Sequence, residues 1–425
     1  MNIYATIYKK GGINLMDRDT LSKIIEEKIN SVKIIDVHTH LYPPFFEKLL
    51  LRGLDELLTY HYLIAETLRY ISIDPDKFFA LPKKEQSEII WKTLFIERSP
   101  ISEAAKGVIT TLNEFGLDLE KRDLEEYRRF FSSLSLEEHI DLVFEKANVD
   151  YVVMTNDPLD MEEMNYWQNN LSLDPRFKPA MRLDKLLDFK NFLKTLRDKG
   201  YDIDKELSEK TIKELKRFLE DSYHLMNPLY AAISLTPDFK FPENSERERI
   251  LREVILPFSE EFNIPLALMI GAKRRINPLL REAGDGIGKG DITAIENLCR
   301  EYPNNKFLVT MLSRENQHEL CVTARKFSNL MIFGCWWFLN NPSLIKEITK
   351  MRIELLGFSF IPQHSDARVL DQLVYKWKHA KRVISDVLIE KYDELLKTGW
   401  VLKPEEIERD IYNLFRGNFI AFLEK

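Results

Sequence analysis

The chain contains 425 residues, of which 44% are hydrophobic and 30% are charged, with 15 glycines and 18 prolines. This composition is typical of a folded globular protein and excludes a disordered or low-complexity chain. The formal net charge is -7 and the sequence has no basic stripe. Because a phosphate backbone requires clustered Lys and Arg, nucleic acid is a poor candidate for a partner.

Three further features limit the class of protein. The longest apolar runs, such as residues 330–339 and 264–270, are shorter than the roughly 20 residues that cross a bilayer, so no membrane span is expected. The first twenty residues lack the apolar core and cleavage site of a secretory signal, which is typical of a cytoplasmic protein. Cys299, Cys321 and Cys335 have no Cys-x-x-Cys spacing, so we expect buried thiols and neither disulfides nor a thiolate zinc site.

The pattern of apolar runs predicts the architecture. From residue 148 onward, short runs rich in Val, Ile, Leu and Phe alternate with amphipathic stretches of helical length, which predicts parallel strands joined by helices. Together with one earlier run, they give eight strands, enough to close a β/α barrel. A doubly wound sheet is the alternative, but its first strand usually precedes a Gly-rich turn, and here the sequence reads DVHTHLYPPF. The predicted strands are 33–37, 151–155, 178–183, 230–235, 265–270, 306–311, 330–336 and 358–362.

The predicted helices define the organisation along the chain. Examples that follow strands are 184–199, 246–262, 291–302 and 316–327. Residues 1–41 are predicted to hold an N-terminal helix and the first strand. Several helices without intervening strands fill 42–147, which predicts a helical insertion over the barrel mouth, and 148–425 form the rest of the barrel and the C-terminal helices.

Two histidines stand two positions apart where the first predicted strand ends. Because side chains alternate along a strand, His38 and His40 point to the same side, into the barrel. Imidazole is the commonest metal ligand. The eighth predicted strand leads into IPQHSDAR, which places Asp366 at the rim where β/α barrels assemble their active sites. Paired histidines also occur by chance on surface strands, but the addition of this carboxylate predicts a metal site.

The motifs resemble a known group of enzymes. His-x-His after the first strand and Asp after the eighth are similar to the amidohydrolase superfamily. Within it, the chain resembles uronate isomerases through LDELLTYHYLIAE, SPISEAAKGVITTLNEFGLD, VVMTNDPLD, MIGAKRR, FGCWWF and SDAR, in family order along nearly the whole chain. It departs from the superfamily at the fifth strand, where Met269 replaces a common metal-binding His. The resemblance implies a (β/α)8 TIM barrel of the metal-dependent hydrolase type that binds a divalent ion, usually zinc. Three ligands, His38, His40 and Asp366, predict one ion.

The resemblance also implies a reaction. Its substrate is a small uronic acid, with D-glucuronate converted to D-fructuronate and D-galacturonate to D-tagaturonate. This isomerisation moves a proton from C2 to C1 through an enediol, which requires a positioned base. The resemblance assigns this work to His61, Tyr62 and Asp366, and it stays open which of them takes the C2 proton. Taken alone, His61 and Tyr62 would be interpreted as helix packing.

Further side chains are candidates for substrate binding. Arg182 ends the third strand and Arg368 follows the predicted metal ligand, so both could hold a carboxylate by paired hydrogen bonds. The resemblance supports both, and it favours Trp337 as a cavity wall. Trp336 points to the opposite side of the predicted strand and is expected in the core. The simpler interpretation of each arginine is an ordinary ion pair. His364 shares strand parity with the predicted ligand and is a weaker candidate.

Two other functions stay open. A metal-dependent hydrolase of a lactone or amide would use the same ligands to hold an activated water. A non-catalytic barrel would bind a sugar acid or a protein. The isomerase interpretation uses more residues, because a hydrolase leaves the His-Tyr pair, the Trp pair and Arg368 without a role. The sequence shows no interface, so assembly into a homo-oligomer is left open.

Overall fold

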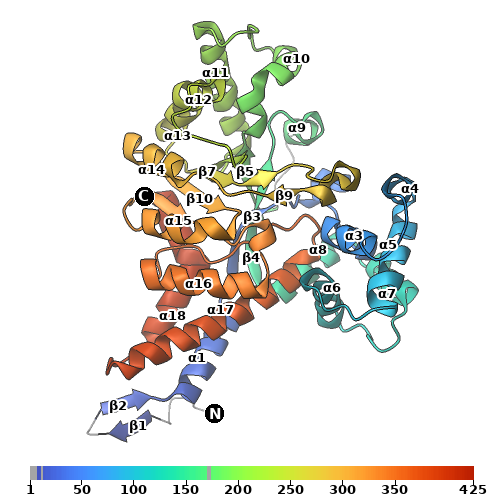
Figure 1. Cartoon of the computed structure of the whole chain (residues 1–425), viewed down its shortest axis with the longest axis vertical. Helices are drawn as coiled ribbons and strands as arrows, with labels where there is room; N and C mark the ends of the chain where they lie inside the picture. The colour runs from blue at the N-terminus through green and yellow to red at the C-terminus, as the bar shows by residue number, and fades with distance from the viewer. Residues whose placement is uncertain (1–6, 11–12, 170–173) are drawn as a thin grey trace.

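The computed structural model of the chain describes residues 7–10, 13–169 and 174–425. Within these residues, seven parallel strands form one sheet in the order β11, β10, β7, β6, β5, β4, β3. Helices surround this sheet, as Figure 1 shows. The strands are β3 (Ile34–Thr39), β4 (Val149–Asn156), β5 (Phe177–Arg182), β6 (Ala231–Leu235), β7 (Leu266–Ile270), β10 (Phe307–Met311) and β11 (Leu330–Ile332).

The strands form because both of their faces are buried. In β7, the sequence LALMI is buried at all five positions, as expected for a parallel sheet covered on both sides. Side chains that point outward, such as Leu266 and Leu268, pack against the helices. Those that point inward, such as Ala267 and Met269, fill the barrel interior. Two separate hydrophobic clusters result, one inside the sheet and one outside it.

The eighth strand is the main departure from the prediction. The segment 358–362 makes one parallel bridge, between Ile361 and Phe333. The Ile361 N–H donates to Ile332 O over 2.9 Å, and the Gly334 N–H donates to Ile361 O over 2.9 Å. The prediction of a full strand is therefore wrong, although the segment still continues the sheet beyond β11.

The chain that directly follows this segment bonds to β3, at the other edge of the sheet. The Asp366 N–H donates to His38 O over 3.0 Å, and the His40 N–H donates to Ala367 O over 2.8 Å. The segment and the residues that follow it thus join both edges of the sheet and close it. The predicted fold class, an α/β barrel of the (β/α)8 kind, is confirmed.

The seventh strand is shorter than predicted. It ends at Ile332, because Gly334 adopts a φ of +70° and turns the chain. Trp336 and Trp337 therefore follow the strand, and Trp337 begins the short helix η8 (Trp337–Leu339). The prediction that both tryptophans end a strand and point to opposite sides is wrong.

The helices differ from the predictions mainly in regularity. The predicted helix 184–199 is a kinked 3-10 segment followed by one short α-helix, because Asp188 is non-helical. The α-helices are α1 (Arg18–Ser31), α2 (Leu54–Leu58), α3 (His61–Leu68), α4 (Pro75–Ala80), α5 (Lys83–Trp91), α6 (Glu103–Glu114), α7 (Leu124–Ser133), α8 (Leu136–Ala147), α9 (Met161–Gln168), α10 (Leu193–Asp198), α11 (Glu209–Met226), α12 (Glu246–Ile250), α13 (Leu256–Glu261), α14 (Ile292–Glu301), α15 (Gln317–Ala324), α16 (Pro342–Leu356), α17 (Gln372–Lys397), α18 (Pro404–Tyr412) and α19 (Asn418–Glu424). The 3-10 and π segments besides η8 are η2 (Pro44–Leu49), η3 (Lys92–Ile96), η4 (Asp184–Phe192), η5 (Leu251–Ile255), η6 (Pro278–Gly284), η7 (Arg314–Asn316) and η9 (Asn413–Gly417).

The segment between β3 and β4 is helical. Its helices lie together to one side of the barrel in Figure 1 and share a hydrophobic cluster that includes Phe78, Trp91 and Tyr127. Helix α3 and the loop that contains η6 pack against each other. This contact brings the start of α3 over the carboxyl ends of the strands. The domain boundaries at 41 and 147 stay a prediction.

The remaining elements lie at the amino ends of the strands and beyond. Phe419 and Phe422 of α19 join the interior cluster of the barrel, so the C-terminal helix plugs this end. Two antiparallel strands, β1 (Ile7–Lys10) and β2 (Ile13–Met16), project past α1 in Figure 1. The three cysteines are buried and free, as predicted. A helix with the length and apolarity needed to span a membrane does not occur in the described residues.

Candidate metal and substrate site

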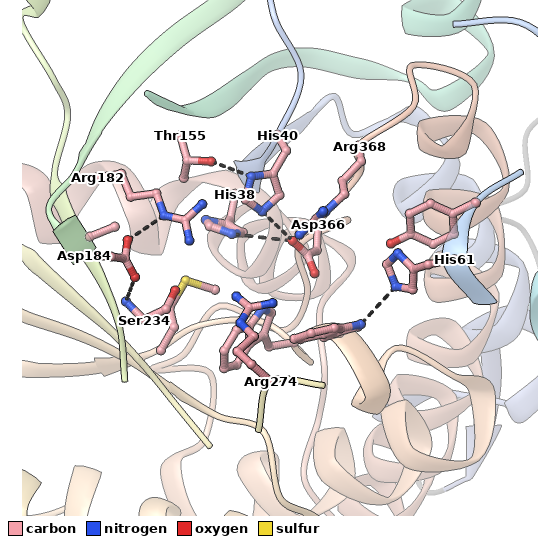
Figure 2. A pocket seen from close by; sticks show the side chains of 15 residues that line it. His38, His40, His61, Thr155, Arg182, Asp184, Ser234, Arg274, Asp366 and Arg368 are labelled. Carbon is pink, nitrogen blue, oxygen red and sulfur yellow. Dashed lines mark hydrogen bonds and ion pairs between the residues drawn. The ribbon is translucent and has the colours of Figure 1, made fainter. Parts of the chain in front are cut away.

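The two predicted histidine ligands lie at the carboxyl end of β3. Their rings are 5.3 Å apart, and both face Asp366. Its Oδ1 lies 3.6 Å from Nε2 of His38 and 3.3 Å from Nε2 of His40. These atoms all lie within 4.8 Å of one another. The structure therefore brings the three predicted ligands together, as Figure 2 shows.

Hydrogen bonds behind the rings fix the tautomer of each imidazole. The Tyr230 hydroxyl donates to Val37 O over 2.8 Å and lies 3.3 Å from Nδ1 of His38. Since its proton is committed, this hydroxyl accepts from Nδ1. Thr155 donates to Thr39 O over 3.0 Å and lies 2.9 Å from Nδ1 of His40, so it accepts in the same way. Both rings therefore present an Nε2 lone pair toward the carboxylate.

This arrangement fits a metal ion. Within the described residues, neither Nε2 of His38 nor Oδ1 of Asp366 has a hydrogen-bond partner, although both atoms are buried. Burial lowers the pKa of both imidazoles, so the neutral form that binds metals is favoured. Three lone pairs that converge on one point form a group that could hold a metal ion.

The ligands open into one cavity. Three guanidinium groups and two carboxylates contribute to the walls. The lining residues are His38, His40, Tyr60, His61, Thr155, Arg182, Asp184, Ala232, Ser234, Met269, Arg274, Trp336, Trp337, Asp366 and Arg368.

Arg182, at the end of β5, is oriented by a carboxylate that the sequence analysis missed. Its Nε donates to Oδ2 of Asp184 over 2.5 Å, while the backbone N–H of Ser234 on β6 donates to Oδ1 over 2.7 Å. Asp184 thus ties the guanidinium to a neighbouring strand. The terminal nitrogens of Arg182 make no hydrogen bond with the described residues, and the group points toward His38 in Figure 2. The terminal nitrogens of Arg182 can therefore donate hydrogen bonds to substrate oxygens.

The other two arginines are held by the loop between β7 and α14. Arg368 donates to Glu282 over 2.9 Å. Arg274 donates to Asp285 over 2.6 Å and lies 5.4 Å from the centre of the Trp337 ring. Each is therefore part of an ion pair and each also lines the cavity. For Arg368, the ion pair is the simpler interpretation given in the sequence analysis.

Residues from the helical insertion complete the wall. His61 lines the cavity, and Trp337 Nε1 donates to its Nε2 over 3.2 Å. Tyr62 is not among the lining residues. Its ring packs against His61, with centres 4.5 Å apart, and against Phe338 at 5.8 Å. The tyrosine on the cavity wall is Tyr60. The predicted pair is therefore close to the site, with only His61 on its surface.

Two aromatic predictions have different outcomes. Trp337 lines the cavity, and Trp336, which we expected only in the core, lines it as well. Both side chains are largely buried, because the turn after β11 carries them across the rim. His364 is fully buried, does not line the cavity, and packs against the rings of His38 and Phe333.

The positions of several lining residues relative to the predicted strands already indicate a place at the site. Thr155 is the last residue of one predicted strand and Asp184 directly follows another, and barrel sites form at these strand ends. Met269, which departs from the superfamily pattern, lines the cavity at the position where the superfamily commonly has a metal-binding histidine. Tyr60 has no such indication, because its place depends on how α3 packs against the η6 loop.

A closed β/α barrel with two histidines and a carboxylate beneath an arginine-lined cavity defines an enzyme site for a small anionic molecule. The uronate isomerase of Bacillus halodurans is 53% identical to this chain, with a TM-score of 0.95 over 97% of this chain and 98% of that protein. The chain belongs to the uronate isomerase family. This confirms the family and the isomerase activity predicted from the motifs, in preference to a hydrolase.

Two more distant structures share the fold. The uronate isomerase of Thermotoga maritima is 15% identical, with a TM-score of 0.77 over 96% of this chain and 98% of that protein. The glucuronate isomerase of Caulobacter crescentus is also 15% identical, with a TM-score of 0.76 over 96% of this chain and 94% of that protein. No family model and no curated protein sequence matches the chain.

Proposed function

We propose that the protein interconverts D-glucuronate with D-fructuronate, and D-galacturonate with D-tagaturonate, and that it uses one divalent metal ion. The main support is the set of three guanidinium groups, from Arg182, Arg274 and Arg368, around one small cavity. Guanidinium groups bind carboxylates by paired hydrogen bonds, and a uronic acid carries one carboxylate. The name of the relative at 53% identity gives the same substrate class. The cytoplasmic location expected from the sequence is part of this proposal.

The proposed metal ligands are Nε2 of His38, Nε2 of His40 and Oδ1 of Asp366. Zinc is our first candidate, because two imidazoles and a carboxylate with an open position suit it. When bound, the ion supplies a Lewis-acidic positive charge to substrate oxygens. The remaining chemistry falls to the side chains.

We assign the proton transfers between C2 and C1 to His61, Tyr62 and Asp366, and we add Tyr60 because it lines the cavity. His61 accepts a hydrogen bond at Nε2, so its single proton lies on Nδ1, from which it can donate to a substrate oxygen. Arg182 and Arg368 would hold the substrate, and Trp337 would form the wall beside it.

The test is isomerisation in heavy water. Metal-free protein is loaded with Zn²⁺, Mn²⁺, Co²⁺ or Mg²⁺, and ¹H NMR follows D-glucuronate and its C2 proton. We expect D-fructuronate to form with at least one ion. Absence of ketose with all four ions would contradict the proposal. Lactone or amide hydrolysis without isomerisation would favour a hydrolase instead.

A pair of variants separates the two tyrosines. Tyr62→Phe and Tyr60→Phe each remove one hydroxyl and keep the ring. Loss of an acid-base group lowers the rate by about 100-fold or more, so the variant with that loss identifies the tyrosine that moves protons. Effects below about tenfold in both variants, at unchanged metal content, would exclude a tyrosine from proton transfer.

A further inference from the structure

The backbone of Asp366 adopts a conformation that other contacts must maintain. Its φ is +51°, in the left-handed region that residues other than glycine adopt infrequently, aspartate and asparagine more often than the rest. Its backbone N–H is bonded to β3, but its carbonyl and that of Ser365 face away from this strand, toward α17. The Ser365 N–H donates to Asp36 Oδ1 over 3.0 Å, and Ser365 O accepts from Asn340 Nδ2 over 3.2 Å. Helix α17 therefore supplies part of the support for this turn.

Lys376, in the first turns of α17, provides this support. Its Nζ donates to Ser365 O over 2.6 Å and to Asp366 O over 3.4 Å. Its side chain is only 6% exposed, and its ammonium pairs with backbone carbonyls. Burial lowers the pKa of this lysine to about 8. Burying an ammonium costs several kcal/mol, so its presence here requires a specific compensation.

The ammonium also faces the wall of the cavity. Its Nζ lies 5.8 Å from the centre of the Tyr60 ring, close to the distance at which a cation and an aromatic ring attract each other. Lys376 thus lies between the turn that carries the carboxylate ligand and the helical insertion. A single side chain contacts both parts of the site.

We propose that Lys376 is a positioning residue, which holds the Ser365–Asp366 turn so that the carboxylate faces the two imidazoles, and which thereby sets the affinity for the metal ion. This inference rests on the metal site of the proposed function. The sign of the effect is informative, because the positive charge of Lys376 on its own opposes the binding of a dication. A loss of metal affinity after removal of this charge is therefore opposite to the direct electrostatic effect and points to lost positioning.

Lys381 provides a matched control. It lies on the same helix, its side chain is 7% exposed, and its Nζ donates to the backbone carbonyl of Val32 over 3.4 Å. Burial lowers its pKa to about 8 as well. It differs from Lys376 in facing α1 and not the turn. Lys381→Met therefore reproduces the loss of a buried ammonium on α17 without touching the site.

The experiment titrates full-length, metal-free protein with Zn²⁺ against a competing chelator, and records thermal unfolding of the same samples. We expect Lys376→Met to weaken Zn²⁺ binding by about 10- to 100-fold, the range for groups that orient metal ligands, and Lys381→Met to leave it within about twofold at a similar loss of thermal stability. Unchanged or tighter binding by Lys376→Met would overturn the inference. A parent protein that does not bind Zn²⁺ would instead refute the proposed metal site.

A second variant covers the case in which Lys376→Met does not fold. Lys376→Arg keeps the charge and the hydrogen-bond donors. A planar guanidinium is larger than an ammonium, so it cannot donate to Ser365 O from the same position. We expect it to fold and to bind Zn²⁺ several-fold more weakly than the parent. Binding equal to that of the parent would overturn the inference.

Discussion

Trp337 Nε1 donates a hydrogen bond to His61 Nε2 over 3.2 Å, and so connects the turn after β11 to the start of α3. Because indole can only donate, His61 accepts at Nε2 and carries its proton on Nδ1. Burial lowers the pKa of His61 to about 3, and the positive charges of Arg368 and Lys376 add to this effect. The imidazole is therefore neutral at physiological pH.

The low pKa of His61 predicts a loss of stability in acid. The ordinary pKa of histidine is about 6.5, so between this value and about 3 the unfolded state binds more protons than the folded state. Stability contributed by neutral His61 is then present above pH 6.5 and is lost as the pH falls. His61→Gln keeps an acceptor for Trp337 and cannot titrate. We expect urea unfolding at pH 7 and pH 5 to show that the parent loses about 2 kcal/mol more than this variant. An equal loss in both proteins would contradict the buried, neutral state of His61.

Removal of the carboxylate ligand predicts loss of metal and activity together. Groups that only orient a ligand change metal affinity by 10- to 100-fold, so Asp366→Asn should weaken Zn²⁺ binding by at least about 100-fold and lower isomerisation in parallel. Metal analysis by mass spectrometry and the NMR assay measure both effects. Asp386→Asn, at an exposed position of α17, serves as the control with parental values. A variant that keeps one bound ion per chain would show that Asp366 is not a ligand.

A substitution at Asp184 should affect substrate binding and not metal binding, because Asp184 contacts Arg182 and not the metal ligands. An amide in its place keeps the bond to the Ser234 N–H but loses the charge that pairs with the guanidinium. A charged hydrogen bond contributes about 1.5 to 3 kcal/mol, so Asp184→Asn should raise KM for D-glucuronate by about tenfold or more, with kcat less affected. Steady-state kinetics at saturating metal measure this split. A drop in metal content, or a loss confined to kcat, would exclude the positioning role.

The features that the sequence predicts well are those determined by residues close together along the chain. The run 265–270 matches β7 (Leu266–Ile270) within one residue, because a strand buried on both faces leaves a continuous apolar run. His38 and His40 also follow from local parity along one strand. Asp366 needs only the further rule that the carboxyl ends of barrel strands share one rim. The structure brings these three side chains together for these reasons.

The missed features depend on contacts between distant parts of the chain. Tyr60 faces the cavity because α3 packs against the η6 loop, and the spacing of the insertion does not reveal this contact. The eighth strand shrinks to one bridge because only Ile361 of this segment bonds to the chain at β11, while the bonds to β3 come from Asp366 and Ala367 further along the chain. The end of β11 at Ile332 is a third case. No local sequence pattern predicts this strand end. The chain turns at Gly334, where the side chain of His364 occupies the space that a Cβ would need.

This last contact predicts an unusually severe glycine substitution. A Cβ on Gly334 would lie 1.8 Å from Cδ2 of His364, and the φ of +70° is unfavourable for any other residue. The left-handed backbone costs about 1 to 2 kcal/mol, and forced overlap in a packed interior adds about 1 to 3 kcal/mol. Gly399 has a φ of +93° with open space around its Cα, so Gly399→Ala should show the backbone cost alone.

Chemical unfolding of five proteins, namely the parent, three single variants and one double variant, separates the two costs. Gly334→Ala should lower the free energy of unfolding by about 2 to 5 kcal/mol, and Gly399→Ala by about 1 to 2 kcal/mol. In a His364→Ala background the overlap is absent, so the cost of Gly334→Ala should fall to that of Gly399→Ala. The difference between the two backgrounds is the coupling energy of the pair. If Gly334→Ala costs the same in both backgrounds, contact with His364 is not what requires glycine, and the end of β11 needs another cause.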